Sequence, residues 1–495
     1  MHYRSLVGQH SLMPNIGTRD AERPPPDSLL TDIADYVRDF AADGKEARRI
    51  ARYCLMDTLG CAMLALNYPA CTKLLGPIVP GAELKGGARV PGTSFELDPV
   101  TAAFNIGAML RWLDFNDTWL AAEWGHPSDN LGAILAVADY LCRHEDAAPA
   151  SSLCMGDVLT AMIKAHEIQG VLALTNSFNR VGLDHVLLVR VASTAVAAEM
   201  LGCDWQQIVN AISNAWLDGG ALRAYRHAPN TGSRKSWAAG DATSRGVRLA
   251  LMARQGEMGY ASALSADTWG FESVLFGGRP VELAKPFTSY VMENILFKIS
   301  FPAEFHAQTA VEAALRLHAS VAHRLDDVRK IVIETQEPGV RIIDKTGELA
   351  NPADRDHCLQ YMVAIALIFG RLTADDYEDE VARDQRIDAL RNTMSVIENP
   401  EFSRDYMDPD KRAIGNAVQV FFSDGSNTER VTVEYPLGHR SRRDEGLPAL
   451  IEKFKQNLAT QFDAGRCETI LSLCSDQAQF EQTTVADFVD LWVTA

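Results

Sequence analysis

The sequence predicts a mainly α-helical protein of two domains, one of which is α+β. Its 495 residues are enough for two ordinary domains and a large buried core. Apolar residues recur at helical spacing through most of the chain. Between residues 295 and 445, strand-like alternation appears among the helical patterns, and helices alone return over residues 447–495.

Helical patterns dominate the first part of the chain. Residues 1–28 end in a proline-rich run and are predicted to be a poorly ordered lead. Residues 67–100 are rich in Gly and Pro and are expected to form a connector with one or two short strands. Helices are predicted over residues 29–40, 49–66, 100–114, 127–142, 156–174, 186–201, 205–216 and 236–256.

The later α+β part has two clear strand signals. Residues 328–335 alternate like a strand, and residues 417–434 predict a hairpin that turns at Asp424-Gly425. Helices are predicted between them, over residues 303–319, 355–369 and 384–396. Together they make an α+β domain of about 150 residues, which is an ordinary domain size.

The composition restricts the function classes. A net charge of −18 argues against nucleic acid or an acidic membrane surface as the main partner. The nine cysteines include no CxxC and no paired zinc spacing, so we expect reduced thiols, no metal and a cytoplasmic protein. His166 lies inside a predicted helix and is assigned to packing. No apolar run is long enough to span a bilayer, and no signal-peptide core is present.

The stretch of residues 114–130 is the first candidate site. If the preceding helix continues, Asp114 and Thr118 share one face, one turn apart. His126 precedes Pro127, which suits the first position of a new helix, so His126 is expected at a helix N-terminus that favours anions. The alternative is a capping carboxylate and a solvated histidine, and the pattern alone leaves the two interpretations equally open.

Three further candidates share this arrangement of a polar side chain just before a helix. His185 precedes the helix of residues 186–201, and Lys235 precedes the helix predicted from residue 236. Lys298 begins a segment that leads through Glu304 to His306 and into another helix. Four such N-termini would form a receptor for a multiply charged carboxylate. Taken singly, His185 could be a core histidine and Lys235 a solvated lysine.

Three segments resemble the MmgE/PrpD family over nearly the whole chain from about residue 30. They are residues 114–119 (DFNDTW) with His126-Pro127, residues 297–310 (FKISFPAEFHAQTA) and residues 354–361 (DRDHCLQY). The resemblance implies an all-helical domain built from residues 29–294 and 446–495, with an α+β lid inserted at residues 295–445. It also implies a site in the cleft, a homodimer, and no cofactor, metal or iron–sulfur cluster.

The resemblance further implies a lyase that eliminates water from 2-methylcitrate, a small tricarboxylate, to give 2-methyl-cis-aconitate in propionate catabolism. Citrate is a further candidate substrate. Related cis-aconitate decarboxylases have site residues that match, in this chain, Asp114, Thr118, His126, His185, Lys235, Lys298 and Tyr361. We expect catalytic roles for Asp114, Thr118, His126, His306 and Tyr361, and substrate binding by His185, Lys235, Lys298 and Glu304.

One departure bears on the reaction. The decarboxylases have a histidine directly after Phe-Pro-Ala, where this chain has Glu304, and His306 follows two residues later. Decarboxylation of cis-aconitate and epimerisation of a small dicarboxylate are the alternatives within the family. A non-catalytic helical scaffold that binds a partner is the alternative from another class.

Overall fold

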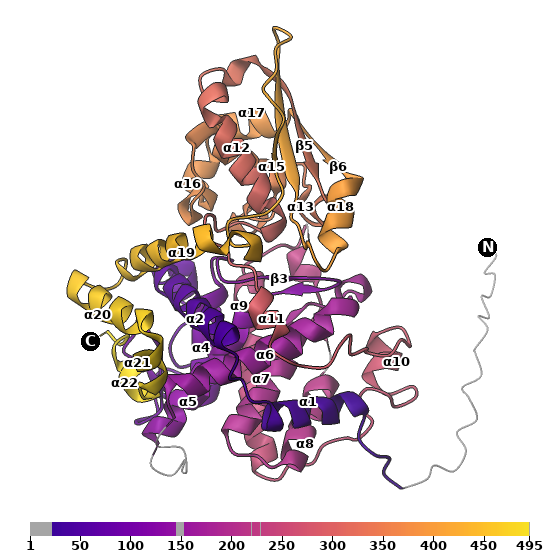
Figure 1. The fold of residues 1–495 in the computed structure, drawn as a ribbon, viewed down its shortest axis with the longest axis vertical. Helices are drawn as coiled ribbons and strands as arrows, with labels where there is room; N and C mark the ends of the chain where they lie inside the picture. Colours follow the sequence, from indigo (N-terminus) through magenta and orange to yellow (C-terminus); the bar gives the residue numbers. More distant parts are fainter. Residues whose placement is uncertain (1–21, 145–152, 219, 228, 495) are drawn as a thin grey trace, which may run out of the picture.

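The computed structural model describes residues 22–144, 153–218, 220–227 and 229–494. It is mainly α-helical, as predicted, and Figure 1 shows a larger helical lobe below a smaller lobe that contains a sheet. One hydrophobic core runs from Leu29 to Ile299 and resumes at Leu447; a second lies between Ala303 and Val433. Most of the predicted lead lies outside the described residues, and Ser28 already begins the first helix.

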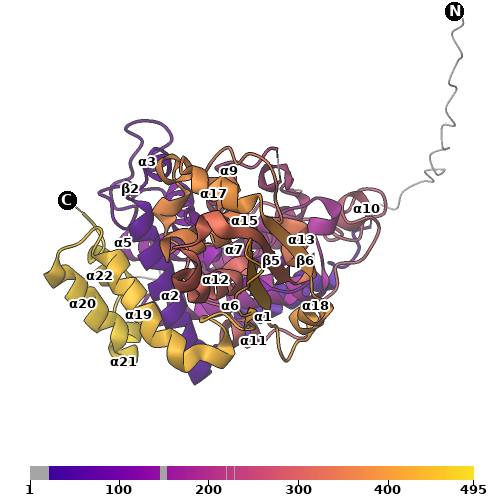
Figure 2. The ribbon, with the colours of Figure 1, turned by 90° about the horizontal axis from the view of Figure 1, so that it is seen from above.

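The helical lobe contains segments from both ends of the chain, and α19 packs against α2 (Figure 2). Its short hairpins pair β1 (Ala88–Arg89) with β2 (Glu96–Leu97) and β3 (Trp119–Leu120) with β4 (Trp124–Gly125). Its helices are α1 (Ser28–Asp39), α2 (Lys45–Ala65), α3 (Pro69–Thr72), α4 (Pro99–Arg111), η1 (Pro127–Asn130), α5 (Leu131–Arg143), α6 (Met155–Thr175), η3 (Asn179–Val181), α7 (Val186–Met200), α8 (Trp205–Leu217), η4 (Ala224–Arg226), α9 (Arg234–Arg254), α10 (Phe271–Leu275), α11 (Tyr290–Asn294), α19 (Arg443–Leu458), α20 (Ala464–Ser475), α21 (Gln477–Gln482) and α22 (Val485–Asp490).

Glycines let α4, α5 and α9 approach closely. A Cβ on Gly107 of α4 would lie 2.8 Å from the Cα of Gly240 of α9, so neither position has room for a side chain. This contact lies one turn from the end of α4 and close to the start of α9. It therefore brings Arg111, the last residue of α4, toward Lys235 in the first turn of α9.

The smaller lobe has a four-stranded sheet in the order β6-β5-β7-β8. Strand β5 (Val328–Thr335) is antiparallel to β7 (Asn416–Phe422) and parallel to β6 (Met394–Glu398), and β7 is antiparallel to β8 (Val431–Val433). Helix α12 packs against α15 and β7. The other elements are η5 (Phe305–Ala307), α12 (Gln308–Val321), η6 (Leu325–Asp327), α13 (Glu337–Ile343), α14 (Pro352–Arg355), α15 (Leu359–Phe369), η7 (Ala374–Tyr377), α16 (Asp379–Ala382), α17 (Gln385–Arg391), α18 (Pro400–Met407) and η8 (Arg440–Arg442).

The three helices predicted in the smaller lobe are shorter than expected. The helix predicted from residue 303 begins at Gln308, and the helix predicted over residues 355–369 is interrupted between α14 and α15, where His357 lies outside both. The helix predicted over residues 384–396 is wrong at its end. Residues 394–398 instead form β6, because pairing with β5 satisfies their backbone and outweighs a weak local preference.

Two passages of the chain between the lobes lie side by side. The backbone N–H of Phe297 donates to the carbonyl oxygen of Gly438 at 3.1 Å. A Cβ on Gly438 would lie 1.7 Å from the carbonyl oxygen of Phe297, so only glycine allows this approach. Lys453 of α19 donates to the carbonyl oxygens of Phe115 and Lys298 and thereby ties the first of these passages to the helical lobe. Among the described helices, none is long and apolar enough to cross a membrane.

Candidate active site

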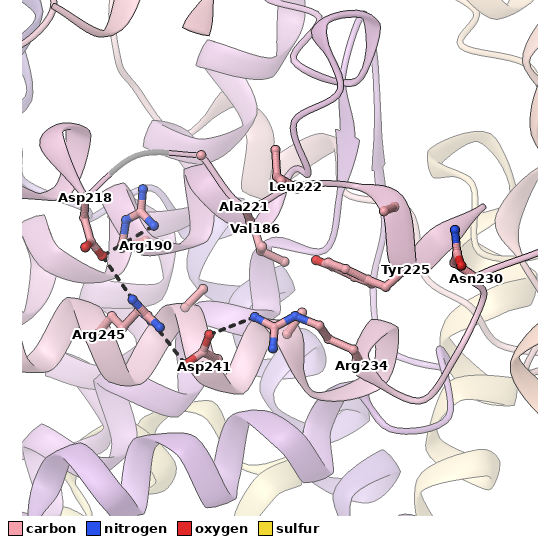
Figure 3. Close-up of a pocket in the computed structure, with 14 residues that line it drawn as sticks. Val186, Arg190, Asp218, Ala221, Leu222, Tyr225, Asn230, Arg234, Asp241 and Arg245 are labelled. Atoms are coloured by element: carbon pink, nitrogen blue, oxygen red, sulfur yellow. Dashed lines mark hydrogen bonds and ion pairs between the residues drawn. The ribbon is translucent and has the colours of Figure 1, made fainter. Parts of the chain in front are cut away.

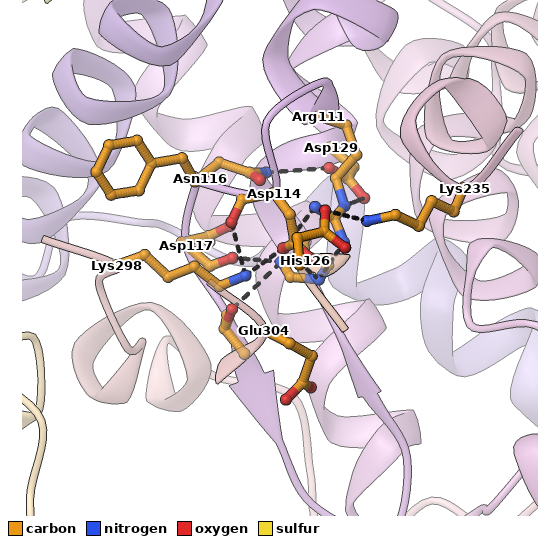
Figure 4. A network of polar contacts seen from close by, with 12 residues as sticks. Arg111, Asp114, Asn116, Asp117, His126, Asp129, Lys235, Lys298 and Glu304 are labelled. Atoms are coloured by element: carbon orange, nitrogen blue, oxygen red, sulfur yellow. Dashed lines mark hydrogen bonds and ion pairs between the residues drawn. The ribbon is translucent and has the colours of Figure 1, made fainter. Parts of the chain in front are cut away.

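Most of the predicted site residues surround one narrow pocket between the two lobes (Figure 4). The helical lobe supplies the loop after α4 and the residue before α7, and the other side is formed by the segment from Lys298 to Phe305 and by His357. The pocket is lined by Arg111, Asp114, Thr118, Leu120, Trp124, His126, His185, Arg223, Arg226, Lys298, Glu304, Phe305, Ile342 and His357.

Asp114 is a buried carboxylate that lines this pocket. Helix α4 ends at Arg111, so the expected helical continuation to Thr118 is wrong, and Asp114 has a left-handed backbone with φ of 50°. Its carboxylate accepts from Arg111 Nη1 at 2.6 Å and from Lys298 Nζ. Burial alone would raise the pKa of Asp114, but Arg111 and Lys298 hold it well below its usual range. Asp114 is therefore ionised and cannot donate a proton near neutral pH.

His126 is held in one tautomer. Its Nδ1 lies 2.6 Å from the carbonyl oxygen of Asp117, which can only accept, so Nδ1 carries the proton. Thr118 Oγ1 lies 3.3 Å from the same nitrogen. Nε2 accepts from Arg111 Nη2 at 2.7 Å. Burial, and then Arg111, lowers the pKa of His126 well below its usual value, so the ring is neutral and Nε2 has a lone pair.

His185 lies directly before α7, as predicted, with its ring centroid 5.7 Å from that of His126. It is buried, and neither ring nitrogen has a hydrogen-bond partner among the described residues. Asp184 beside it pairs with Arg226 and Arg223. Burial lowers the pKa of His185 well below its usual value. A neutral, unsatisfied imidazole that lines the pocket is suited to hydrogen-bond a ligand.

Lys235 lies in the first turn of α9 rather than before the helix. Its Nζ donates to Asp356 Oδ2 at 2.5 Å and lies 3.3 Å from His357 Nδ1. His357 Nε2 is in turn 3.9 Å from Asp114 Oδ2. Burial lowers the pKa of Lys235, and the neighbouring carboxylate of Asp356 opposes that shift. This lysine therefore joins the pocket through a buried charge pair rather than as an unpaired cation.

The remaining predicted residues lie at different distances from this centre. Glu304 lines the pocket and accepts from the backbone N–H of His306 and from its Nδ1, at 2.8 and 2.7 Å. His306 lies behind Glu304 and contacts Tyr406 at 3.3 Å. Tyr361 is separate, because its hydroxyl donates to the carbonyl oxygen of Asp376 at 2.7 Å and it lines another pocket.

The sequence prediction omitted Arg111, Asp356 and His357. Arg111 is the one charged residue of an otherwise apolar helix end, and it contacts both Asp114 and His126. A single arginine in an otherwise apolar helix could have indicated that Arg111 is a site residue. Asp356 and His357 lie within the family-like segment of residues 354–361, but only the fold shows that they meet Lys235.

The expected receptor of four cationic helix N-termini is only partly present. His126 and His185 precede η1 and α7, whereas Lys298 lies in a loop well before α12. The side chains leave about 20 Å³ of free space, room for about one water molecule. A tricarboxylate therefore needs the pocket to widen. A larger open pocket near Arg190, Arg234 and Arg245 contains none of the predicted site residues (Figure 3).

Sequence comparisons assign the chain to a known family. The chain matches the MmgE/PrpD N-terminal domain over residues 31–284 and the MmgE/PrpD C-terminal domain over residues 301–477. It is 63% identical over 474 residues to the 2-methylcitrate dehydratase of Salmonella typhimurium, covering 95% of this chain and 98% of that protein. Identity to the 2-methylcitrate dehydratase of Cupriavidus necator is 61%, covering 96% and 99%. A protein of Yarrowia lipolytica named mitochondrial 2-methylcitrate dehydratase is 56% identical, covering 96% and 92%. The chain belongs to the MmgE/PrpD family.

Proposed function

We propose that this protein is a hydro-lyase that removes water from 2-methylcitrate to give 2-methyl-cis-aconitate in propionate catabolism. The geometric observation that carries the proposal is a neutral His126 whose Nε2 lone pair lies among buried cations. Relatives more than 60% identical over nearly the whole chain bear the name 2-methylcitrate dehydratase, which supports the choice of substrate.

The difficult step is removal of a weakly acidic proton from the carbon beside a carboxylate. His126 Nε2 is the group we assign to accept this proton, because its tautomer leaves a lone pair there. Arg111 and Lys298 are placed to stabilise the charge that develops on the neighbouring carboxylate. An anionic substrate would also raise the pKa of His126 from its depressed value and make it a stronger base.

The other predicted residues are proposed to bind substrate or assist the departing hydroxyl. His185 lines the pocket, and both of its ring nitrogens lack a hydrogen-bond partner in the described part of the chain. Lys235 is connected to the pocket through its contact with His357. Thr118 supports His126, and Glu304 links the pocket to His306. Tyr361 can assist only if the smaller lobe rearranges internally, since its hydroxyl is bonded to Asp376 of the same lobe.

Product analysis tests the reaction directly. Purified protein is incubated with 2-methylcitrate and, separately, with cis-aconitate, and the products are identified by mass spectrometry. We expect loss of water from 2-methylcitrate and no carbon dioxide from cis-aconitate. Release of carbon dioxide would indicate a decarboxylase, and no turnover of either compound would favour a scaffold.

We further propose that the enzyme needs no metal or other cofactor. The proposed steps use only acid–base and charge-stabilising side chains of the pocket. Activity is expected to survive exhaustive dialysis against a chelator. Loss of activity that added iron or zinc restores would contradict this proposal.

A homodimer and a cytoplasmic location complete the proposal, following the family resemblance and the thiol-rich sequence. All nine cysteines are free, and six of them are buried. The mass of the protein in solution, measured by light scattering, tests the dimer.

Substrate is expected to alter the motion of the smaller lobe. The free space of about 20 Å³ is too small for a tricarboxylate, so the lobes must separate for entry and close again around the ligand. Amide hydrogen exchange of residues 298–306 and 355–361 should slow at saturating 2-methylcitrate. Unchanged exchange in both segments would contradict closure of a cleft at this place.

A further inference from the structure

A buried group of three side chains lies directly behind His126. It consists of Cys54 of α2, Asp117 of the loop after α4, and His166 of α6. His166 Nε2 lies 3.0 Å from Asp117 Oδ2, and Cys54 Sγ lies 3.6 Å from each of these atoms. All three side chains are inaccessible to solvent. The proposed reaction uses none of them.

Asp117 connects this group to the active site. Its backbone carbonyl oxygen accepts the Nδ1 proton of His126 at 2.6 Å (Figure 4). Its carboxylate accepts from the hydroxyl of Ser128, at 2.5 Å, and from the backbone N–H of the same residue. Asp117 therefore holds His126 through its backbone carbonyl and Ser128 through its carboxylate. The tautomer of His126 depends on the position of Asp117.

The hydrogen bonds of His166 define its charge. Nδ1 lies 2.8 Å from the carbonyl oxygen of Met162, which can only accept, so Nδ1 carries a proton. Nε2 faces the carboxylate oxygen that also accepts from Cys54, and a proton on Nε2 makes this contact attractive. Burial, and then Asp117, raises the pKa of Cys54 well above its usual value, so the thiol keeps its proton and donates to Asp117.

We propose that His166, as an imidazolium paired with Asp117, is a positioning residue that keeps His126 in its reactive tautomer. The charge of His166 compensates the fully buried carboxylate of Asp117. Asp117 then presents its carbonyl oxygen to His126 Nδ1, which leaves the Nε2 lone pair facing Arg111 at the pocket. The inference rests on the proposed role of His126 as the proton acceptor.

Two substitutions of His166 separate its two hydrogen bonds. His166→Gln can place an amide N–H near the Nε2 position and donate to Asp117, whereas His166→Asn reaches only the Met162 carbonyl. Misplacing a reacting group by about 1 Å can cost about 10²-fold in rate. We expect kcat to fall by about that factor in His166→Asn, with KM changed little, and to fall less in His166→Gln, which keeps the hydrogen bond to Asp117 but not the charge. Equal losses in the two variants would overturn the proposal.

The double variant tests whether His166 acts through His126. In a His126→Gln background, the additional His166→Asn change should not lower turnover further, because the group it positions is already gone. A full additional loss would overturn the proposal. His318→Asn is the matched control, since His318 Nδ1 also donates to a backbone carbonyl, that of Leu367, in the other lobe.

Two direct measurements do not depend on turnover. In protein labelled with ¹⁵N-histidine, a ring with both nitrogens protonated should be present and should be absent in His166→Asn; a neutral His166 would overturn the proposal. Elemental analysis should find no stoichiometric metal, and a metal that His166→Asn loses would overturn it too. An inactive wild-type protein would refute the proposed function, whereas these two results bear on His166 alone.

Discussion

His126→Gln is expected to reduce turnover by about 10²- to 10⁴-fold, which is the usual contribution of general acid–base catalysis. Glutamine keeps a polar group of similar reach, but it cannot accept a proton near neutral pH. The side chain is buried and its Nε2 accepts from Arg111, an interaction the glutamine amide oxygen can still make. Binding of 2-methylcitrate, measured by calorimetry, should therefore change little while kcat falls.

The control for this variant is His318→Gln, in α12 and away from the pocket, which should leave turnover near the wild-type value. If His126→Gln turns over normally, His126 is not the proton acceptor. The assignment then passes to His185, which also lines the pocket, or to His306 and Tyr361, which reach it only through other groups or after movement.

Short-range patterns predicted much of the fold. The strand at residues 328–335 and the hairpin at Asp424-Gly425 have strong local signals, and both are present, with Gly425 at a φ of 86°. Strand β6 was missed because its stability comes from pairing with β5, which lies more than fifty residues earlier in the chain. The spacing of apolar residues within one segment cannot predict pairing with a distant strand.

Convergence in the candidate pocket was predictable for residues that lie in one segment. Asp114, Thr118 and His126 belong to one stretch and meet in the pocket, although the backbone reverses at Asp114 rather than continuing as a helix. Partners from distant segments were not predictable. Arg111 appeared to belong to an apolar helix, and the pairing of Lys235 with Asp356 depends on how α9 packs below the smaller lobe.

Because Lys235 pairs with Asp356, a substitution at Lys235 is expected to change stability as well as substrate affinity. If Lys235 only bound the substrate, its replacement would lower substrate affinity and leave stability unchanged. Lys235 also compensates Asp356, which is nine-tenths buried, and breaking a buried pair by removing one partner costs about 3–5 kcal/mol. Lys235→Met is therefore expected to lower the free energy of unfolding by about this amount, measured by urea denaturation at pH 8.

The pH dependence of this loss follows from His357, whose Nδ1 lies 2.7 Å from Asp356 Oδ1. Burial, and then Lys235, lowers the pKa of His357 in the wild type. Without Lys235 the pKa rises, so a protonated His357 can compensate Asp356 below that pKa, and this stabilisation is lost as the pH increases. The deficit of Lys235→Met should thus be smaller at pH 6 than at pH 8, and an equal deficit at both would contradict the arrangement.

The double variant Lys235→Met/Asp356→Asn separates the structural role of Lys235 from substrate binding. Neutralising Asp356 removes the uncompensated charge, so the double variant should recover most of the lost stability. It still lacks the ammonium group, and a charge-assisted hydrogen bond to a substrate carboxylate contributes about 1.5–3 kcal/mol. Affinity for 2-methylcitrate should therefore remain about 10- to 100-fold below that of the wild type. If the stable double variant binds as tightly as Asp356→Asn alone, Lys235 serves only to hold Asp356 in place, and the carboxylate contacts belong to Arg111, Lys298 and His185.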